Sequence, residues 1–162
     1  MKVHDMEQIY NDCVRIVYRY LLSLTNDNDI AEELTQETFY RATYSLDKYD
    51  ESCKVSVWLC QIAKHIWYQE LAKRSKRKHE ELKDDTPSTE ISPEGITILA
   101  GEKVELYKAI NTLDERMRNV VYMRLSGELS FSEIGEILGK SESWARTTFY
   151  RAKQRIREVL SC

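Results

Sequence analysis

Proline and glycine are scarce in this chain, which has two prolines and five glycines among 162 residues. Both prolines lie between residues 87 and 93, and the glycines are isolated from one another. This excludes a glycine-rich loop of the kind that cradles phosphates. No stretch shows the apolar–polar alternation of a half-buried strand. The sequence therefore predicts an all-α protein.

Long hydrophobic runs are also missing. No segment approaches the roughly 18 consecutive apolar residues that a membrane-spanning helix needs. The first 13 residues, MKVHDMEQIYNDC, are too polar for a secretory signal. We therefore expect a cytoplasmic protein with no membrane insertion of its own.

The cysteines do not form a metal-binding pattern. The four of them stand at positions 13, 53, 60 and 162, without a Cys-x-x-Cys pair and without ligand spacing to any histidine. We expect no metal and no cofactor. Cys13 and Cys60 fall on apolar helical faces and are expected to pack as small hydrophobic side chains. A thiol switch at Cys53 or Cys162 stays open.

A general excess of positive charge is absent, because the net charge is −3. This argues against a uniformly basic nucleic-acid binder. The cations gather instead in residues 64–78 and 146–157, and the acids in residues 27–37 and 80–94. Such a distribution is typical of a protein that contacts DNA with one surface and a basic protein with another.

Apolar residues recur at helical spacing over about 5–24, 30–46 and 57–73, and again after residue 100. The pattern fails from about Ser75 to Gly101, a polar stretch that holds both prolines. We therefore predict two small helical domains, residues 1–78 and 100–162, joined by a flexible acidic linker over residues 79–99.

The segment from Ser130 to Arg157 predicts a helix-turn-helix. Ser130 and Glu133 have the spacing of a capping box, and Gly139 suits a left-handed helix end. Ser141 is placed to cap a second helix. Its expected buried stripe is Ala145, Phe149, Ala152, Ile156 and Val159. Its other face carries hydroxyls, cations and an aromatic ring, which suit the DNA major groove. A plain helical hairpin with a solvated charged face is the alternative.

Three segments, taken in order, resemble the extracytoplasmic-function (ECF) group of bacterial sigma-70 family factors. AEELTQETFYRA at residues 31–42 is similar to the polymerase-binding helix of that family. VSVWLCQIAKHIWYQELAKR at residues 55–74 is similar to its promoter-melting helix. LSFSEIGEILGKSESWARTTFYRAKQRI at residues 129–156 is similar to its terminal helix-turn-helix. The likeness covers nearly the whole chain and lacks the extra middle domain of larger sigma factors.

The resemblance implies a sigma factor that binds core RNA polymerase and directs it to a class of promoters, without enzymatic activity of its own and under control of an anti-sigma factor. The residues that it places on the −35 element are Ser143, Arg146, Thr147, Tyr150, Arg151 and Lys153. Those that it places on the −10 element are Lys54, Ser56, Trp58, Lys64, His65 and Tyr68. Those that it places on the polymerase are Glu33, Gln36, Glu37 and Phe39.

Two other classes of protein remain as alternatives at this point. A conventional helix-turn-helix repressor or activator explains the C-terminal domain but not the acidic second helix, and it normally needs a dimer to meet two half-sites. An enzyme with a carboxylate metal cluster at Glu32, Glu33 and Glu37 lacks the Glu-x-x-His motif that accompanies such clusters in helical bundles.

Overall fold

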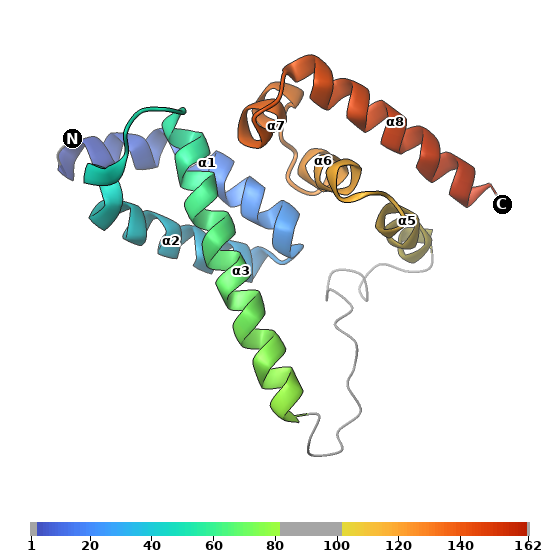
Figure 1. The fold of residues 1–162 in the computed structure, drawn as a ribbon, viewed down its shortest axis with the longest axis horizontal. Coiled ribbons are helices and arrows are strands. Elements are labelled where there is room, and N and C mark those ends of the chain that lie inside the picture. The colour runs from blue at the N-terminus through green and yellow to red at the C-terminus, as the bar shows by residue number, and fades with distance from the viewer. Residues whose placement is uncertain (1–2, 82–101, 162) are drawn as a thin grey trace.

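The computed structural model describes residues 3–81 and 102–161, and every regular element within them is a helix. The helices form two groups, α1–α3 and α5–α8, which lie against each other (Figure 1). This is the all-α architecture of two helical domains that the sequence predicts. One apolar cluster runs through both groups, so the two cores meet rather than remain separate.

The first group consists of α1 (Val3–Thr25), α2 (Asn28–Ser45), a short 3₁₀ turn η1 (Leu46–Lys48) and α3 (Val55–Glu81). Asp27 caps α2, because its carboxylate accepts a hydrogen bond from the Ile30 backbone N–H at 3.0 Å. Val17, Leu21 and Leu59 are fully buried where the three helices pack. Cys13 and Cys60 are also buried, as their positions on apolar faces predict.

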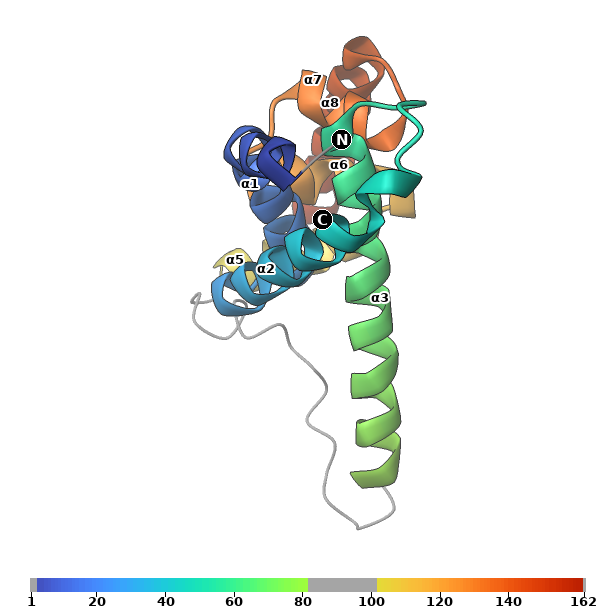
Figure 2. The ribbon, with the colours of Figure 1, turned by 90° about the vertical axis from the view of Figure 1, so that its left-hand side faces the viewer.

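Helix α3 is longer at both ends than its apolar pattern predicts. It begins at Val55 rather than Val57, and it continues past Lys73 to Glu81. The last turns project beyond the other helices (Figures 1 and 2). They are rich in Lys, Arg and Glu, which are strong helix formers without any need for a packed face. The expected linker, residues 79–99, lies outside the described residues beyond Glu81.

The second group consists of α5 (Glu102–Asn111), α6 (Glu115–Leu125), α7 (Phe131–Leu138) and α8 (Glu142–Leu160). The capping box at α7 is confirmed: the Glu133 N–H donates to the Ser130 hydroxyl at 3.1 Å, and the Ser130 N–H donates to the Glu133 carboxylate at 2.9 Å. Gly139 ends α7 in the left-handed conformation with φ 71°, and Ser141 caps α8. The predicted helix-turn-helix is therefore confirmed in its local geometry.

The buried stripe of α8 is shorter than expected. Ala145, Phe149, Ala152 and Ile156 are buried, whereas Val159 is 43% exposed. The prediction for Val159 is wrong because the last turn of α8 is no longer covered, and residues 157–160 are all exposed.

Close approach of backbones brings the two groups together at the turn after α6. A Cβ on Gly127 would lie 2.7 Å from the Arg19 carbonyl oxygen of α1, so only glycine fits this contact. The Arg19 guanidinium in turn donates to the Glu128 carbonyl at 3.1 Å and pairs with the Glu128 carboxylate at 3.1 Å. This contact places α6 beside α1 and α7 beside the start of α3.

Candidate nucleic-acid interface

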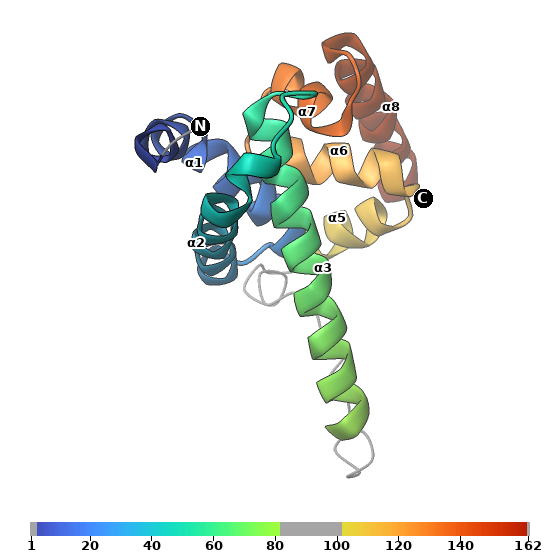
Figure 3. The ribbon, with the colours of Figure 1, turned by 60° about the vertical axis from the view of Figure 1, so that its left-hand side comes forward.

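The outer face of α8 carries the residues expected to read DNA. All six are exposed, and α8 lies on the side of its group away from α1–α3 (Figures 1 and 3). They are Ser143, Arg146, Thr147, Tyr150, Arg151 and Lys153. The buried residues of the same helix alternate with them at helical spacing, so packing against α6 and α7 fixes which face is presented.

An aromatic ring from α7 supports this face. The Phe131 ring has the Arg146 guanidinium at 5.4 Å and the Arg124 guanidinium at 4.4 Å from its centroid. The Glu142 carboxylate holds Arg146 from the other direction at 3.1 Å. Phe131 was not expected on this face from the sequence, and its half-buried ring lies beside the Arg146 guanidinium. Arg146 is exposed and suits contact with phosphates and base edges, whereas Arg124 is half-buried and donates to the Leu129 carbonyl at 3.1 Å.

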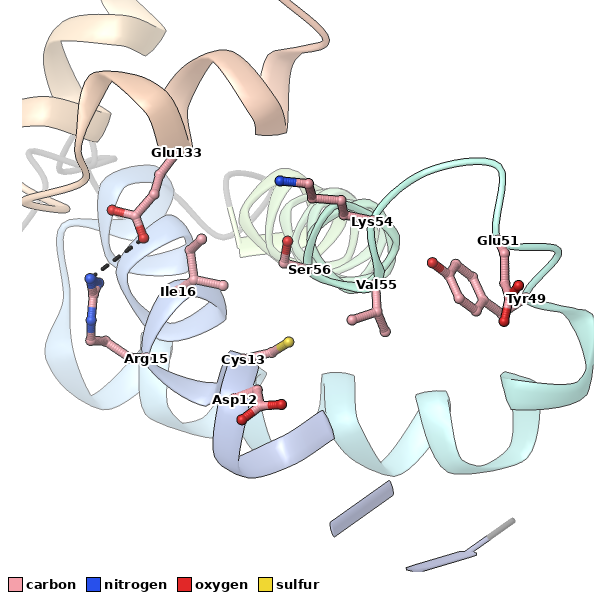
Figure 4. A pocket seen from close by; sticks show the side chains of 10 residues that line it. All are labelled: Asp12, Cys13, Arg15, Ile16, Tyr49, Glu51, Lys54, Val55, Ser56 and Glu133. Atoms are coloured by element: carbon pink, nitrogen blue, oxygen red, sulfur yellow. Dashed lines mark hydrogen bonds and ion pairs between the residues drawn. The ribbon is translucent and has the colours of Figure 1, made fainter. Parts of the chain in front are cut away.

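The expected −10 residues begin in the loop before α3. Lys54 and Ser56 line a pocket of about 560 Å³, whose other walls come from α1 and, through Glu133, from α7 (Figure 4). Glu133 points toward Arg15 of α1, and the two pair at 3.5 Å (Figure 4). Tyr49 also lines the pocket, and its ring lies 5.0 Å from that of Trp58. Trp58 is half-buried against the core, and its ring packs against Tyr49 of this loop.

The remaining −10 residues split between two faces of α3. Lys64 and Tyr68 line a small hollow of about 30 Å³ against α1, α6 and α7, and the Lys64 ammonium lies 5.5 Å from the centroid of the Tyr68 ring. His65 lies on an exposed face and contacts Gln69, with 3.2 Å between the two nitrogens. The structure therefore brings Lys54, Lys64 and Tyr68 toward the second group of helices and leaves His65 free of it.

The two groups of helices carry opposite charges where they meet. The Lys54 ammonium lies 2.7 Å from the Glu136 carboxylate of α7. This carboxylate raises the pKa of Lys54 above its ordinary value, through its hydrogen bond and its charge. Together with the pairs of Arg15 and Arg19, the N-terminal group supplies the cations and the C-terminal group supplies the carboxylates.

The residues expected to meet the polymerase lie on α2. Glu33 and Gln36 are exposed, and Glu37 pairs with Arg41 at 2.8 Å. Phe39 is only 6% exposed, because its ring packs edge-on against Tyr10 of α1 at 4.9 Å. The floor of a surface groove of about 870 Å³ includes Phe39. The groove is lined by Met6, Glu7, Tyr10, Gln36, Phe39, Tyr40 and Thr43.

Within residues 3–81 and 102–161, no group of three His, Cys, Asp or Glu side chains is arranged to hold a metal ion. None of the described helices is both long enough and apolar enough to cross a membrane.

Two family models match this chain, one over each group of helices. The model of sigma-70 region 2 matches residues 9–77, and the model of sigma-70 region 4 matches residues 103–156. The ECF RNA polymerase sigma factor SigM of Bacillus subtilis is 30% identical over 158 residues, which is 95% of this chain and 94% of that protein. The RNA polymerase sigma factor YlaC of the same organism is 28% identical over 99% of this chain and 95% of its own length. The chain therefore belongs to the ECF group of the sigma-70 family.

Solved structures show the same fold. The sigma factor RpoE of Bartonella quintana, in a co-crystal with the anti-sigma factor NepR, is 22% identical with a TM-score of 0.60, over 98% of both chains. CnrH, in complex with the cytosolic domain of CnrY, is 17% identical with a TM-score of 0.52, over 99% of this chain and 90% of that one. Membership of the family makes the protein a transcription initiation factor that acts with core RNA polymerase on promoter DNA.

Proposed function

We propose that this sigma factor divides promoter recognition between residues 1–78, which bind polymerase and open the −10 element, and residues 100–162, which bind the −35 element. Residues 79–99 connect the two. The exposed, six-residue face of α8 carries the second assignment, because hydroxyls, cations and Tyr150 stand outward while the opposite face is buried. The protein has no catalytic activity of its own in this proposal, and the polymerase supplies the chemistry in the cytoplasm.

Opening of the −10 element is assigned to the loop before α3 and to the exposed side chains of that helix. A base that leaves the duplex costs a few kcal/mol of stacking and pairing, so a receiving pocket must offset it. The pocket beside Tyr49, Lys54 and Ser56 offers an aromatic ring, a cation and a hydroxyl for this purpose. Lys64 and Tyr68 become available to the same strand once the second group of helices moves away from them.

Polymerase binding is assigned to α2, through Glu33, Gln36, Glu37 and the groove above Phe39. The exposed Glu33 carboxylate, the exposed Gln36 amide and the half-buried Glu37 carboxylate suit a basic protein surface. The exposed Tyr40 and Tyr44 rings add apolar area beside them. Phe39 acts by shaping the groove, since little of its side chain is exposed.

Control by an anti-sigma factor completes the proposal. The RpoE structure that shares this fold was solved with its anti-sigma factor NepR. An inhibitor that binds both groups of helices would cover the −10 loop and the groove on α2 at once. Co-purification from the native cell tests this point, and a chain that is always recovered free and active would contradict it.

The main experiment is transcription with purified components. Core polymerase supplied with this protein should start transcription from a defined set of genomic fragments, with start sites downstream of a shared pair of sequence elements. Core polymerase alone serves as the control. Absence of specific starts on any genomic fragment would refute the proposed function.

A further inference from the structure

A chain of hydrogen bonds joins the polymerase-binding helix α2 to the promoter-melting helix α3. The Arg41 Nε donates to the Glu37 Oε1 at 2.8 Å, and the Arg41 Nη1 donates to the Gln69 Oε1 at 3.0 Å. The Gln69 Nε2 lies 3.2 Å from the His65 Nε2. The chain thus begins at a residue assigned to polymerase binding and ends at one assigned to the −10 element.

The chemistry of these groups fixes the direction of each bond. Arginine can only donate, so the Gln69 carbonyl oxygen must face Arg41 and the amide nitrogen must face His65. The amide nitrogen can also only donate, so the His65 Nε2 must accept. An accepting Nε2 places the single ring proton of neutral His65 on Nδ1.

The Gln69 amide connects α2 to α3, because its oxygen accepts from Arg41 and its nitrogen lies beside His65. The amide is planar, so its oxygen and its nitrogen cannot turn independently, and a change at Arg41 reaches His65 through one rigid group. The pair Glu37–Arg41 lies one turn apart on α2, and the pair His65–Gln69 lies one turn apart on α3. Arg41 and Gln69 also line a groove of about 540 Å³ between these helices, with Glu33, Glu37, Glu70 and Lys73 as its other charged residues.

We propose that Arg41 and Gln69 are positioning residues, which hold the His65 ring in one orientation and one tautomer for the melted promoter strand and tie it to the polymerase-binding face at Glu37. This inference rests on the proposed roles of α2 and α3. His65 and Gln69 are exposed in the free protein, where water competes for their bonds. The bonds strengthen when polymerase and DNA exclude that water, so the chain exerts its effect in the promoter complex.

The tautomer is tested in the free protein at pH 8, by long-range ¹H–¹⁵N NMR spectra in which His65 is assigned through its loss in His65→Asn. The wild type should show an unprotonated Nε2 and a protonated Nδ1. Gln69→Glu keeps an acceptor for Arg41 but turns a carboxylate toward His65, so Nε2 should become protonated. A protonated Nε2 in the wild type, or a tautomer unchanged in Gln69→Leu, would overturn the assignment.

The positioning role is tested by the rate at which polymerase with this protein opens a cognate promoter, followed by permanganate reactivity of unpaired thymines. Gln69→Leu should slow opening by about threefold to tenfold, as expected for the loss of one or two hydrogen bonds, with core affinity unchanged. Gln8→Leu is the matched control, because Gln8 likewise donates one turn away, to Asp12 of α1 at 2.9 Å, and Gln8 itself lines none of the assigned pockets, although Asp12 lines the pocket beside Lys54.

The outcomes separate this inference from the proposed function. If the wild type opens no promoter, the proposed function fails. If the wild type opens promoters and Gln69→Leu opens them as fast as Gln8→Leu does, the coupling through Gln69 is wrong. Arg41→Ala, which frees the Gln69 amide to turn, should reproduce both the altered tautomer and the slower opening, and failure on either count contradicts the chain.

Discussion

The Lys54 ammonium and the Glu136 carboxylate form an ion pair of 2.7 Å across the two groups of helices. Lys54 belongs to the loop assigned to the −10 element, and Glu136 belongs to the first helix of the helix-turn-helix. A carboxylate therefore occupies the side of Lys54 that a DNA phosphate would otherwise approach. In the proposed −10 contact, the Lys54 ammonium would exchange this carboxylate for a phosphate.

Reversal of the charge at position 136 should open the molecule. Glu136→Lys places an ammonium against Lys54, so the free protein should become more extended, with a larger radius of gyration in small-angle X-ray scattering. The effect on the free energy of unfolding should be small, about 1 kcal/mol or less, because Lys54 is 79% exposed. The exchange Lys54→Glu with Glu136→Lys restores an opposite-charge pair and should restore the compact form. A radius that is the same in all three proteins would contradict this prediction.

Substitution of Gly127 should disturb the contact between α1 and α6. An added Cβ meets the Arg19 carbonyl at 2.7 Å and the Met123 carbonyl at 2.9 Å, and backbone atoms cannot move aside cheaply. We expect Gly127→Ala to cost about 1–3 kcal/mol, as overpacking generally does, measured by urea unfolding. Gly139→Ala is the comparison: it meets no atom within 4 Å but has a positive φ. It should lower stability through the backbone alone and leave the radius of gyration unchanged, unlike Gly127→Ala.

Alkaline pH should weaken the fold. Burial raises the pKa of the Cys60 thiol and of the Tyr20 hydroxyl well above their ordinary values, so both groups stay neutral in the folded protein. The unfolded chain loses the Cys60 proton near the ordinary thiol value of 9.0. The folded chain therefore holds more protons above that pH, and the free energy of unfolding falls as pH rises further.

Thermal unfolding followed by circular dichroism between pH 8 and pH 11 checks this. Cys60→Ala removes one of the two groups and should make the decline shallower by up to about 1.4 kcal/mol per pH unit. The variant is compared with its own stability at pH 8, because loss of the buried sulfur lowers stability at every pH. Equal slopes in the two proteins would show that Cys60 does not cause the decline.

Arg146→Ala should reduce discrimination at the −35 element. If the guanidinium contacts a base edge bidentately, its loss costs about 1–3 kcal/mol on the preferred sequence and much less on others. Fluorescence anisotropy with a panel of −35 duplexes measures this. Arg155 is an exposed cation one residue before the buried Ile156, and we expect it to contact a phosphate. Arg155→Ala should therefore weaken binding equally on every duplex. Equal weakening by Arg146→Ala would demote Arg146 to a phosphate contact.

Local features of the fold were predictable from sequence because neighbouring residues determine them. Ser130, Glu133 and Gly139 stand at fixed offsets around one helix, and the structure confirms each role. The spacing of apolar residues did not predict that Trp67 is buried while its neighbour Tyr68 is exposed. These adjacent aromatics differ because α3 turns Trp67 toward the core and Tyr68 toward its rim.

Side-chain contacts between distant segments could not be predicted from the sequence. Nothing in the pattern around Lys54 indicates that Glu136 faces it. Nothing around Arg41 indicates that the Gln69 carbonyl of another helix accepts its hydrogen bond. Phe39 shows the limit within a single helix, since a polymerase-facing residue was expected and a nearly buried ring was found. In each case tertiary packing sets the position, and residue type alone does not reveal it.

The contact between α1 and the turn after α6 joins two parts of one chain, which residues 82–101 connect covalently. A short tether holds its ends at an effective concentration on the order of millimolar. Within that tether, the exposed ion pairs of Lys54, Arg15 and Arg19 add to the apolar cluster that the two groups share, although each pair alone contributes little. A competing surface that offers matching charges and apolar area can replace this contact without unfolding either group, so the protein can exchange an internal partner for an external one.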